Sequence, residues 1–367
     1  MIKENHKTVT NPTSIFPIPP YFYGMNKTQL PLWLIKLTHF EYWTWWMFYI
    51  PLLPYWLFQA VRTRSLTFFT NADPCIDYGG FFGESKMDIL RQIQKEYLPK
   101  TIFIEKGTPL KEILDRLMQE DLVYPIICKP NVGERGTQVE KLYSNYDFME
   151  YLSNVHEDFI IQEFITYDIE LGVLYYRYPD QAKGHVSSIT RKEFLSVVGD
   201  GKSTVEQLMQ QSTRARFQLD SMRKRIGDMG MNEVIKAGEK RILEPIGNHC
   251  RGTKFLDNNF LKNSQLDSVF DKIALPINGF HYGRFDMKVK SIEDLYEGKN
   301  IRIMELNGVS SEPGHIYDPQ NTLWAAYRDL AHHWEVIADI SIQQQRRGIK
   351  TVPVSTLWKV VRGHFLT

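Results

Sequence analysis

Two stretches of the sequence decide the fold, GFHYGRFDMKV (residues 279–289) and IRIMELNGVSSEPGHIYDP (residues 301–319). Each contains a strand-like run, and the short linker between them predicts an antiparallel pair. Glu305 and Asn307 are two residues apart, so they share one face of their strand, and Asp286 lies near them across the ladder. Hard oxygen ligands are the set that Mg²⁺ prefers when it also holds nucleotide phosphates. The pair therefore predicts a metal site at Asp286, Glu305 and Asn307.

Arg284 precedes Asp286 by two residues and shares its face of the strand. A fixed guanidinium at that place would stabilise an oxyanion and a phosphoryl group during transfer. The alternative is a surface hairpin with scattered charges. Against it, the acid of MELNG interrupts an apolar strand and has no other reason to face inward, which favours metal binding.

A second informative segment is YPIICKPNVGERGTQVEKLYS (residues 124–144), in which a strand delivers Lys129 to a loop with Gly133 and Gly136. Glycines let backbone amides approach phosphate oxygens, and a neighbouring lysine neutralises their charge. The loop is therefore a candidate cover for a triphosphate. A β-hairpin with two turn glycines is the commoner structure and stays an open alternative.

The segment VVGDGKSTVEQL (residues 197–208) contains GKST, which suggests a phosphate-binding P-loop. A P-loop needs a glycine five residues before Gly201, and that position is Ser196, so the spacing excludes it. The pattern instead predicts a strand, a tight Gly-Asp-Gly turn and a helix with a capping box formed by Ser203 and Glu206.

The overall composition excludes several classes of protein. Charged residues make up 24% of the 367 residues and the net charge is +1, which argues against a nucleic-acid surface. The three cysteines lie far apart without a CxxC pair, which argues against a disulfide framework and a cysteine zinc site. No Ser-His-Asp set is recognisable in the sequence. The first twenty residues lack the features of a signal peptide, so we expect a protein of the reducing cytoplasm.

Five of the eight tryptophans lie between residues 33 and 56, and the run from Tyr42 to Phe58 carries no charged side chain. The run is slightly short for a membrane span and contains Pro51 and Pro54, which argue against a straight transmembrane helix. Two interpretations stay open. One is an interfacial or re-entrant membrane segment, and the other is an aromatic wedge packed on the protein's own core or on a dimer partner.

The remaining sequence alternates short apolar runs with helical patterns. Residues 84–96 (ESKMDILRQIQKE) predict a helix with Met87, Leu90, Ile93 and Gln94 on one stripe. Further along, the patterns predict a helix at residues 109–120, strands at PIICKP and VEKLYS, and a helix at DFMEYLSN. Such alternation favours a layered α/β or α+β architecture.

The order of these segments and their local sequence motifs resemble those of the ATP-grasp superfamily. Over residues 84–320 the chain resembles its carboxylate–amine ligases, which include D-alanine–D-alanine ligase and cyanophycin synthetase. The resemblance implies an α+β fold (α/β layered) of two subdomains that clasp ATP, here with an atypical aromatic N-terminal segment. The expected parts are a tail and Trp-rich segment at 1–66, a short preceding region at 67–124, the ATP-grasp domain at 125–345 and a C-terminal tail at 346–367.

The resemblance also implies roles for individual residues. In such ligases two lysines contact the nucleotide, one on a strand before the glycine loop and one at the start of a helix, and they match Lys129 and Lys86. Arg284 matches the catalytic arginine, and Asp286, Glu305 and Asn307 match the magnesium cluster. The other implied nucleotide contacts are Gly133 and Gly136 for phosphate, Gln162, Glu163, Phe164 and Ile165 for adenine, Glu170 for ribose with Asp168 as a competitor, and Arg191 for phosphate or substrate. The implied cofactors are ATP and Mg²⁺, or Mn²⁺ in its place.

The expected function is therefore ATP-dependent ligation of a carboxylate to an amine through an acyl phosphate. Ser311, Glu312 and His315 follow the metal strand and are candidates for the acceptor site, with a plain loop as the alternative. Transfer to a hydroxyl or thiol, and an inactive membrane-associated nucleotide-binding scaffold, are the competing hypotheses. We expect carboxylate and amine substrates, no nucleic acid, a cytoplasmic protein with contact to the inner face of the membrane as an open possibility, and a homodimer by analogy alone.

Overall fold

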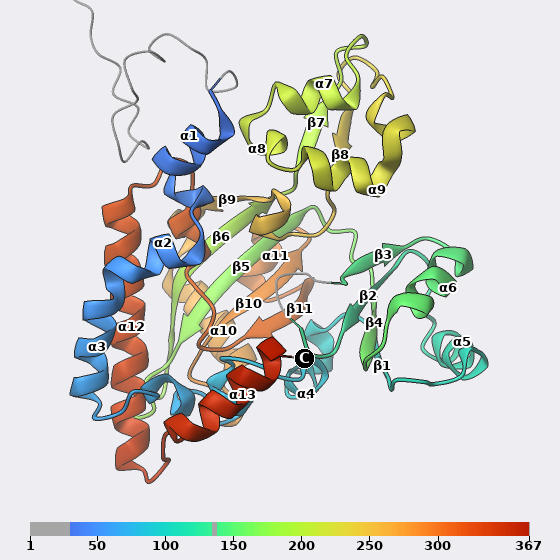
Figure 1. Ribbon diagram of the computed structural model, residues 1–367. Coiled ribbons are helices and arrows are strands. Elements are labelled where there is room, and N and C mark those ends of the chain that lie inside the picture. Colours follow the sequence, from blue (N-terminus) through green and yellow to red (C-terminus); the bar gives the residue numbers. More distant parts are fainter. Residues whose placement is uncertain (1–29, 134–137, 367) are drawn as a thin grey trace, which may run out of the picture.

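The computed structural model describes residues 30–133 and 138–366, with side chains described as far as residue 362. Over these residues two larger antiparallel sheets each carry their own helices and their own apolar core (Figure 1). This arrangement confirms the α+β class expected from the sequence. No helix in the described part of the chain is long and apolar enough to cross a membrane.

The smaller unit is a four-stranded sheet in the order β1-β4-β2-β3. Its elements are β1 (Thr101–Ile104), α5 (Leu110–Gln119), β2 (Ile126–Pro130), β3 (Glu140–Leu142), α6 (Asn145–Asn154) and β4 (Phe159–Glu163). The two helices pack Ile113 and Phe148 onto the buried side of the strands. Because β1 pairs with β4, this sheet extends across the boundary expected at residue 124.

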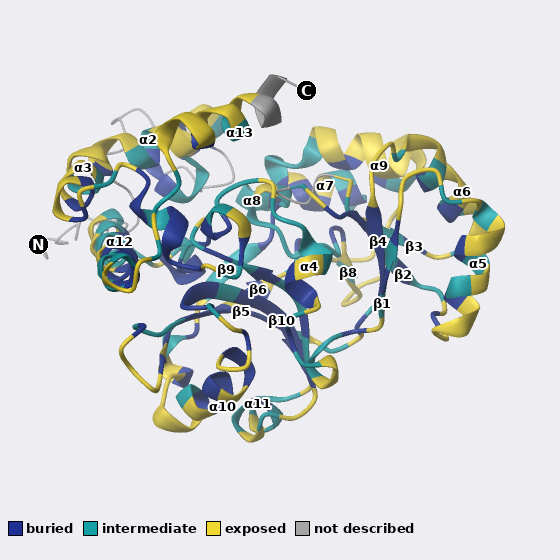
Figure 2. Cartoon of the chain, turned by 90° about the horizontal axis from the view of Figure 1, so that it is seen from below, coloured by how far each residue is buried: buried dark blue, intermediate teal, exposed yellow. Residues whose placement is uncertain are grey.

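The larger unit is a five-stranded sheet in the order β11-β10-β5-β6-β9. Its strands are β5 (Ile169–Tyr176), β6 (His185–Glu193), β9 (Lys254–Asp257), β10 (Tyr282–Val289) and β11 (Ile301–Asn307). The helices α10 (Ser264–Ala274) and α11 (Ile292–Glu297) cover one side of it, and Phe270 of α10 packs against Phe285 of β10 (Figure 2). The antiparallel pairing of β10 with β11 was predicted and is confirmed.

A small insertion between β6 and β9 forms its own core. It contains β7 (Ser196–Val198), α7 (Val205–Gln210), α8 (Thr213–Arg216), α9 (Leu219–Met231) and β8 (Lys240–Ile242). The expected capping box is displaced by one residue, because Thr204 and Gln207 form it in place of Ser203 and Glu206. The reason is that Asp200 takes the Ser203 hydroxyl, with 2.7 Å between Ser203 Oγ and Asp200 Oδ2.

The helix expected at residues 84–96 is much shorter than predicted. α4 (Lys86–Leu90) is followed by a turn and by the 3₁₀ helix η7 (Lys95–Tyr97). In the turn, the amides of Gln92 and Ile93 donate to carbonyls three residues earlier. Apolar residues three apart fit an α-helix and a 3₁₀ turn equally well, so their spacing alone could not distinguish the two.

The N-terminal helices pack against a long helix near the C-terminus. The segments are α1 (Leu32–Thr38), η3 (Phe40–Tyr42), α2 (Trp45–Tyr49), η4 (Ile50–Leu52), α3 (Leu53–Arg62), α12 (Leu323–Arg346) and α13 (Val354–Leu366). Ala60 of α3 and Val336 of α12 belong to one buried cluster. The remaining 3₁₀ helices are η5 (Phe68–Asn71), η6 (Asp77–Gly79), η8 (His249–Arg251), η9 (Asn259–Leu261) and η10 (Gly314–Tyr317). Cys75, Cys128 and Cys250 are all free thiols.

Candidate active site

Asp286 lies near the middle of the larger sheet, on the strand between β11 and β5. It pairs with Glu305 on one side and with Gly172 on the other. A Cβ atom on Gly172 would lie 3.1 Å from Asp286 Oδ1 and 3.2 Å from Arg284 Cδ. Glycine at this position therefore leaves room for the two charged side chains to lie over strand β5.

Two cations hold the Asp286 carboxylate. Arg284 donates through Nε to Oδ1 at 2.9 Å and through Nη2 to Oδ2 at 3.1 Å, and Lys192 Nζ lies 3.4 Å from Oδ1. Asn307 Nδ2 donates to Oδ2 at 3.3 Å. Burial opposes ionisation, yet the two cations lower the pKa of Asp286 to about 2. Asp286 is thus an ionised carboxylate in the interior.

The three expected metal ligands differ in what they already bind. A carboxylate has about four lone-pair sites, and protein donors occupy all four on Asp286. Glu305 makes no hydrogen bond or ion pair with any residue that the structure describes, and the Asn307 side-chain oxygen is also left for a ligand. The residues fit a hard cation, provided that Arg284 or Lys192 turns away from Asp286 when the cation binds. Across residues 30–133 and 138–366, no three His, Cys, Asp or Glu side chains gather in a metal-binding group.

Lys129 connects the two units. It extends from β2 of the smaller sheet, and its Nζ donates to Met304 O of β11 at 2.9 Å and to Gln162 Oε1 at 3.3 Å. Burial lowers the pKa of Lys129 to about 8, while the nearby Glu305 carboxylate favours the charged form. An ammonium group that loses its charge at mild pH therefore lies between the sheets.

The loop expected to cover phosphate is described only as far as Gly133 and again from Gln138. Lys86, at the start of α4, donates through Nζ to the Gly133 carbonyl, and its backbone amide donates to Asn131 O at 2.9 Å. The expected contact at Gly136 falls outside the described residues. The start of α4 and the loop before Gly133 are thus joined by two hydrogen bonds.

The residues expected to hold adenine lie at the end of β4 and just beyond it. Lys288 donates to the Ile165 carbonyl at 3.0 Å, and Lys141 Nζ lies 3.4 Å from the centre of the Phe164 ring. The Glu163 carboxylate turns to the other side and accepts from the Lys100 backbone amide at 3.2 Å. Its side chain therefore points away from the cluster.

Lys192, which sequence reasoning missed, takes the place that Arg191 was expected to fill. Lys192 Nζ lies 3.4 Å from Glu170 Oε1 as well as from Asp286, so it joins the expected ribose and metal positions. Arg191 pairs with Leu171 and its side chain is exposed on the opposite face of β6. The expectation for Arg191 is therefore wrong by one residue, and one residue in a strand reverses the face.

Glu170 is buried and Asp168 is exposed, which favours Glu170 of the two competitors. The loop residue Gly247 touches it so closely that a Cβ atom there would meet Glu170 Oε1 at 2.0 Å. The position of this loop against the cluster could not be derived from its sequence. The close contact explains why residue 247 is a glycine.

The loop after β11 brings Glu312 to Arg284, the arginine expected to be catalytic. Arg284 Nη1 donates to the Glu312 carbonyl at 3.2 Å, and Tyr317 Oη donates to Glu312 Oε2 at 2.7 Å. Burial raises the pKa of Glu312 to about 7, and no cation within the described chain pairs with its carboxylate. His249, whose ring lies 5.2 Å from that of Tyr317, is buried as well, which lowers its pKa to about 3.

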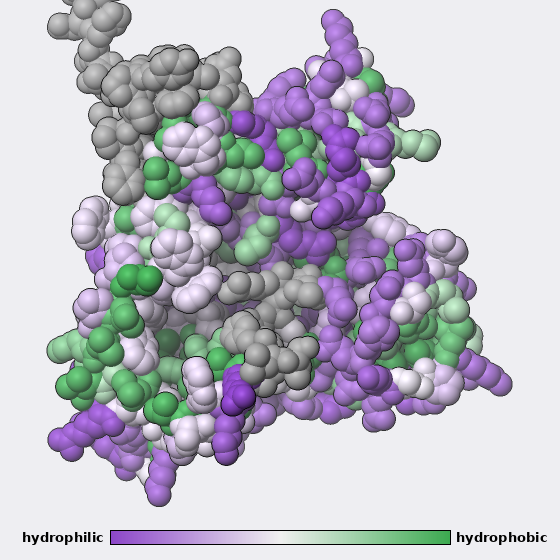
Figure 3. Space-filling model, viewed as in Figure 1, coloured by the Kyte–Doolittle hydropathy of each residue, from purple (hydrophilic) through white to green (hydrophobic). Residues whose placement is uncertain are grey.

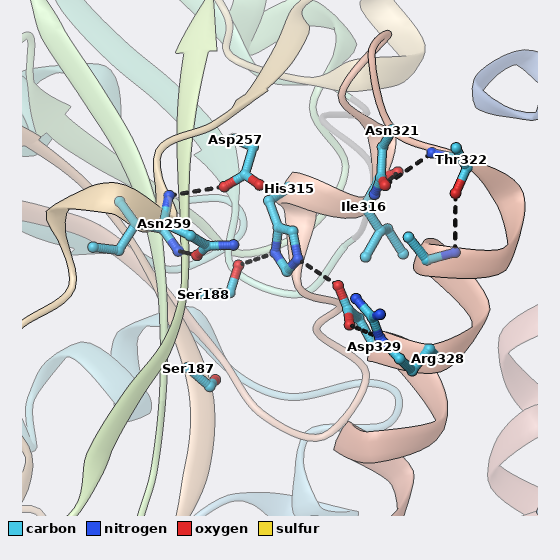
Figure 4. Close-up of polar contacts among 12 residues, drawn as sticks. Ser187, Ser188, Asp257, Asn259, His315, Ile316, Asn321, Thr322, Arg328 and Asp329 are labelled. Atoms are coloured by element: carbon cyan, nitrogen blue, oxygen red, sulfur yellow. Dashed lines mark hydrogen bonds and ion pairs between the residues drawn. The ribbon is translucent and has the colours of Figure 1, made fainter. Parts of the chain in front are cut away.

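His315, another acceptor candidate, belongs to a Ser-His-Asp array that the sequence did not reveal. Its Nδ1 lies 2.7 Å from Ser188 Oγ and its Nε2 lies 3.0 Å from Asp329 Oδ2 (Figure 4). Ser188 and His315 are almost fully buried, so the hydroxyl is not open to a substrate. The array ties η10 to β6 and α12. It therefore positions the loop that carries Glu312. The third acceptor candidate, Ser311, is buried, and its hydroxyl donates to the Gly308 carbonyl.

Comparison with known proteins finds similarity in structure alone. No model of a protein family matches the sequence, and no curated protein matches it. A D-alanine–D-alanine ligase from Bacillus anthracis is similar at a TM-score of 0.39 and 16% identity, covering 72% of this chain and 68% of that one. VanG D-Ala:D-Ser ligase from Enterococcus faecalis is similar at a TM-score of 0.36 and 14% identity, covering 65% of this chain and 57% of that one. A bifunctional glutathione synthetase from Pasteurella multocida gives 0.36 and 12%, covering 70% of this chain and 35% of its own length.

The D-alanine–D-alanine ligase and the glutathione synthetase are ATP-grasp enzymes, the class that the sequence resembles. With TM-scores below 0.5 these are distant likenesses in fold. The chemistry of this chain therefore has to follow from its own charged residues.

Proposed function

We propose that this chain is an ATP-dependent carboxylate–amine ligase of the ATP-grasp type, which forms an amide through an acyl phosphate. One observation carries the proposal. A buried cluster of opposite charges lies on β5, β6 and β10, and Lys129 reaches its edge at β11 from the other sheet. Burying charges is costly, so a cluster in which the Glu305 carboxylate has no hydrogen bond or ion pair among the described residues is best explained by a charged substrate.

In the first step, a carboxylate oxygen of the substrate attacks the γ-phosphorus of ATP, and the bond to the ADP oxygen breaks. Lys86 and Lys129 neutralise phosphate charge from the smaller unit, while Arg284 holds the transferring group. Mg²⁺ or Mn²⁺ would neutralise further charge on the phosphates. Asp286, Glu305 and Asn307 would hold this cation. The product of the step is an acyl phosphate.

In the second step, an amine attacks the acyl carbon, phosphate leaves, and the surplus proton of the amine passes to a base. We assign Glu312 to the acceptor end, because Arg284 donates to its backbone carbonyl while its carboxylate pairs with no cation in the described chain. Such a carboxylate attracts a substrate ammonium and can take its proton. This favours an amine over a hydroxyl or a thiol as the acceptor.

For the nucleotide, we propose that adenine lies along Gln162 to Ile165 and that ribose binds Glu170. The Phe164 ring, which already lies under Lys141, offers a flat apolar surface, and the Ile165 carbonyl is close to Lys288. Because Lys192 joins Glu170 to Asp286, the ribose and phosphate ends of one nucleotide would meet a single chain of charges.

The proposal is tested by ADP release with ATP and Mg²⁺ across pooled carboxylates, each combined with pooled amines, hydroxyl compounds or thiols. Native protein is compared with Glu305→Gln, which keeps the shape of the side chain and removes its charge. We expect one carboxylate and amine pool to stimulate the native protein, with the stimulation lost in the variant. Stimulation by hydroxyl or thiol pools would support transfer to those acceptors, and ATP binding without turnover in any pool would support the scaffold hypothesis.

A further inference from the structure

The outer side of α2, η4 and α3 is apolar over its whole length. Trp46, Ile50, Leu53, Leu57 and Val61 follow one another at intervals of three or four residues, which places them on one face of a helical segment. This face points to solvent, since Trp46 is 50% exposed and Val61 is 78% exposed. The side of α3 that packs inward carries Gln59 and Ala60. The helix is therefore amphipathic in the reverse sense, with its apolar stripe outside.

The C-terminal helix α13 continues this surface. Figure 2 shows α3, α2 and α13 along one edge of the molecule. Val354 and Trp358, one turn apart, are 54% and 66% exposed. Figure 3, in the view of Figure 1, shows green and pale atoms over much of the left half, with most of the strongly hydrophilic atoms on the right half and a further group at the lower left. We call the exposed side chains of residues 45–61 and of Val354 and Trp358 the apolar face.

Basic residues predominate around the apolar face, and the acids Glu41 and Asp339 beside it are each ion-paired with an arginine. The run from Tyr42 to Val61 contains no charged residue, and exposed Lys36 and Arg64 flank it on either side. The segment from residue 348 to 366 contains Lys350, Lys359 and Arg362 and no acid. Such a rim complements a negatively charged surface, and basic residues beside Trp are typical of proteins that lie in the headgroup layer.

We propose that the apolar face is a docking surface for an anionic lipid bilayer, on which α3 lies parallel to the membrane plane. Leu57, Phe58 and Val61 would enter the boundary of the acyl chains, and Trp46 and Trp358 would lie at the level of the headgroups. A second copy of the chain fits this face less well. A two-fold contact would bring the same mainly basic rims together, while Glu41 and Asp339 are already ion-paired within their own chain.

The experiment is flotation of the full chain with vesicles of phosphatidylcholine alone and with vesicles that also contain phosphatidylglycerol. We expect the native protein to float with the anionic vesicles and to be released by high salt. Phe58→Glu places a charge in the stripe and should lower the bound fraction at least about tenfold. Phe260→Glu is the matched control, because Phe260 is 78% exposed and lies outside the apolar face.

Equal flotation of the native protein and Phe58→Glu would overturn the proposal, and so would no flotation of the native protein on anionic vesicles. The other candidate for binding to the apolar face is a second copy of the chain. Light scattering tests it by measuring the mass of the protein in solution. A native dimer that Phe58→Glu converts to a monomer, without vesicle binding, would mean that the face joins two copies. These measurements need no turnover, so they stand apart from the proposed ligase activity.

Discussion

The interior around β10 holds charged side chains, whereas the outer side of α2 and α3 holds apolar ones. In most folded proteins charged side chains are exposed and large apolar ones are buried, so the two regions depart from this distribution in opposite directions. In the interior, each charge of the Glu170, Lys192, Asp286 and Arg284 chain faces an opposite charge, so desolvation is offset within the protein. The apolar face has no such compensation in the described chain, and its burial would release about 25 cal/mol for each Å². The first region is held together by its own ion pairs, and the second has no partner among the described residues.

Removing the central anion should have the largest effect on stability. Asp286→Asn leaves Arg284 and Lys192 buried without their carboxylate, and we expect the free energy of unfolding to fall by about 3–5 kcal/mol. Urea unfolding of both proteins measures the difference. Glu305→Gln is the matched control on the neighbouring strand and should cost less than about 1 kcal/mol, because Glu305 has no ion pair among the described residues. Equal stability of the two variants would mean that the cluster is not held by Asp286.

A closer comparison uses two adjacent residues of β6, Lys192 and Arg191, whose side chains lie on opposite faces of the strand. Lys192→Met leaves Glu170 and Asp286 close together without a shared cation, which should lower the free energy of unfolding by about 3 kcal/mol. Arg191→Met removes an exposed charge and should change it by less than about 0.5 kcal/mol. Thermal or urea unfolding of the two variants tests the assignment. If Arg191→Met lowered the free energy of unfolding more than Lys192→Met, Arg191 and not Lys192 would be the residue of β6 that faces the cluster.

The success and failure of the sequence predictions differ between these regions for physical reasons. The position of Asp286 across the ladder from Glu305 or Asn307 followed from two strands and a short linker, and in the structure Asp286 pairs with Glu305. The choice between Arg191 and Lys192 could not be made, because it depends on which face of β6 turns to β5 and a shift of one residue reverses it. The Ser188, His315 and Asp329 array unites three distant segments, and no local pattern could have found it.

The Trp-rich segment shows a different limit. Its composition predicted an apolar surface, yet its alternatives stayed open, since periodicity marks one face of a helix without saying which way that face turns. The structure resolves this for α3, where Gln59 is buried and Val61 is exposed. Orientation came from packing against α12, which lies far away in the sequence.

Nucleotide affinity should depend on pH through Lys129. Burial lowers its pKa to about 8, so the ammonium is mostly charged at pH 7 and mostly neutral at pH 9. About one charged amine in ten remains one pH unit above the pKa, so we expect the Kd for ATP to rise up to about tenfold from pH 7 to 9. Titration calorimetry at the two pH values measures it. Lys129→Met should bind weakly and show no such rise, and an equally steep rise in that variant would assign the effect to another group.

The smallest effect on stability should come from the apolar face. Phe58 is 59% exposed, and Phe58→Ser should change the free energy of unfolding by less than about 0.5 kcal/mol, although it removes an aromatic ring. Phe285→Ala, in the fully buried core of the larger sheet, should cost about 3–5 kcal/mol. Urea unfolding in the absence of lipid compares them. A cost above about 2 kcal/mol for Phe58→Ser would mean that the ring is already buried against protein in solution, and then the contrast between a satisfied interior and an unpartnered surface would not hold.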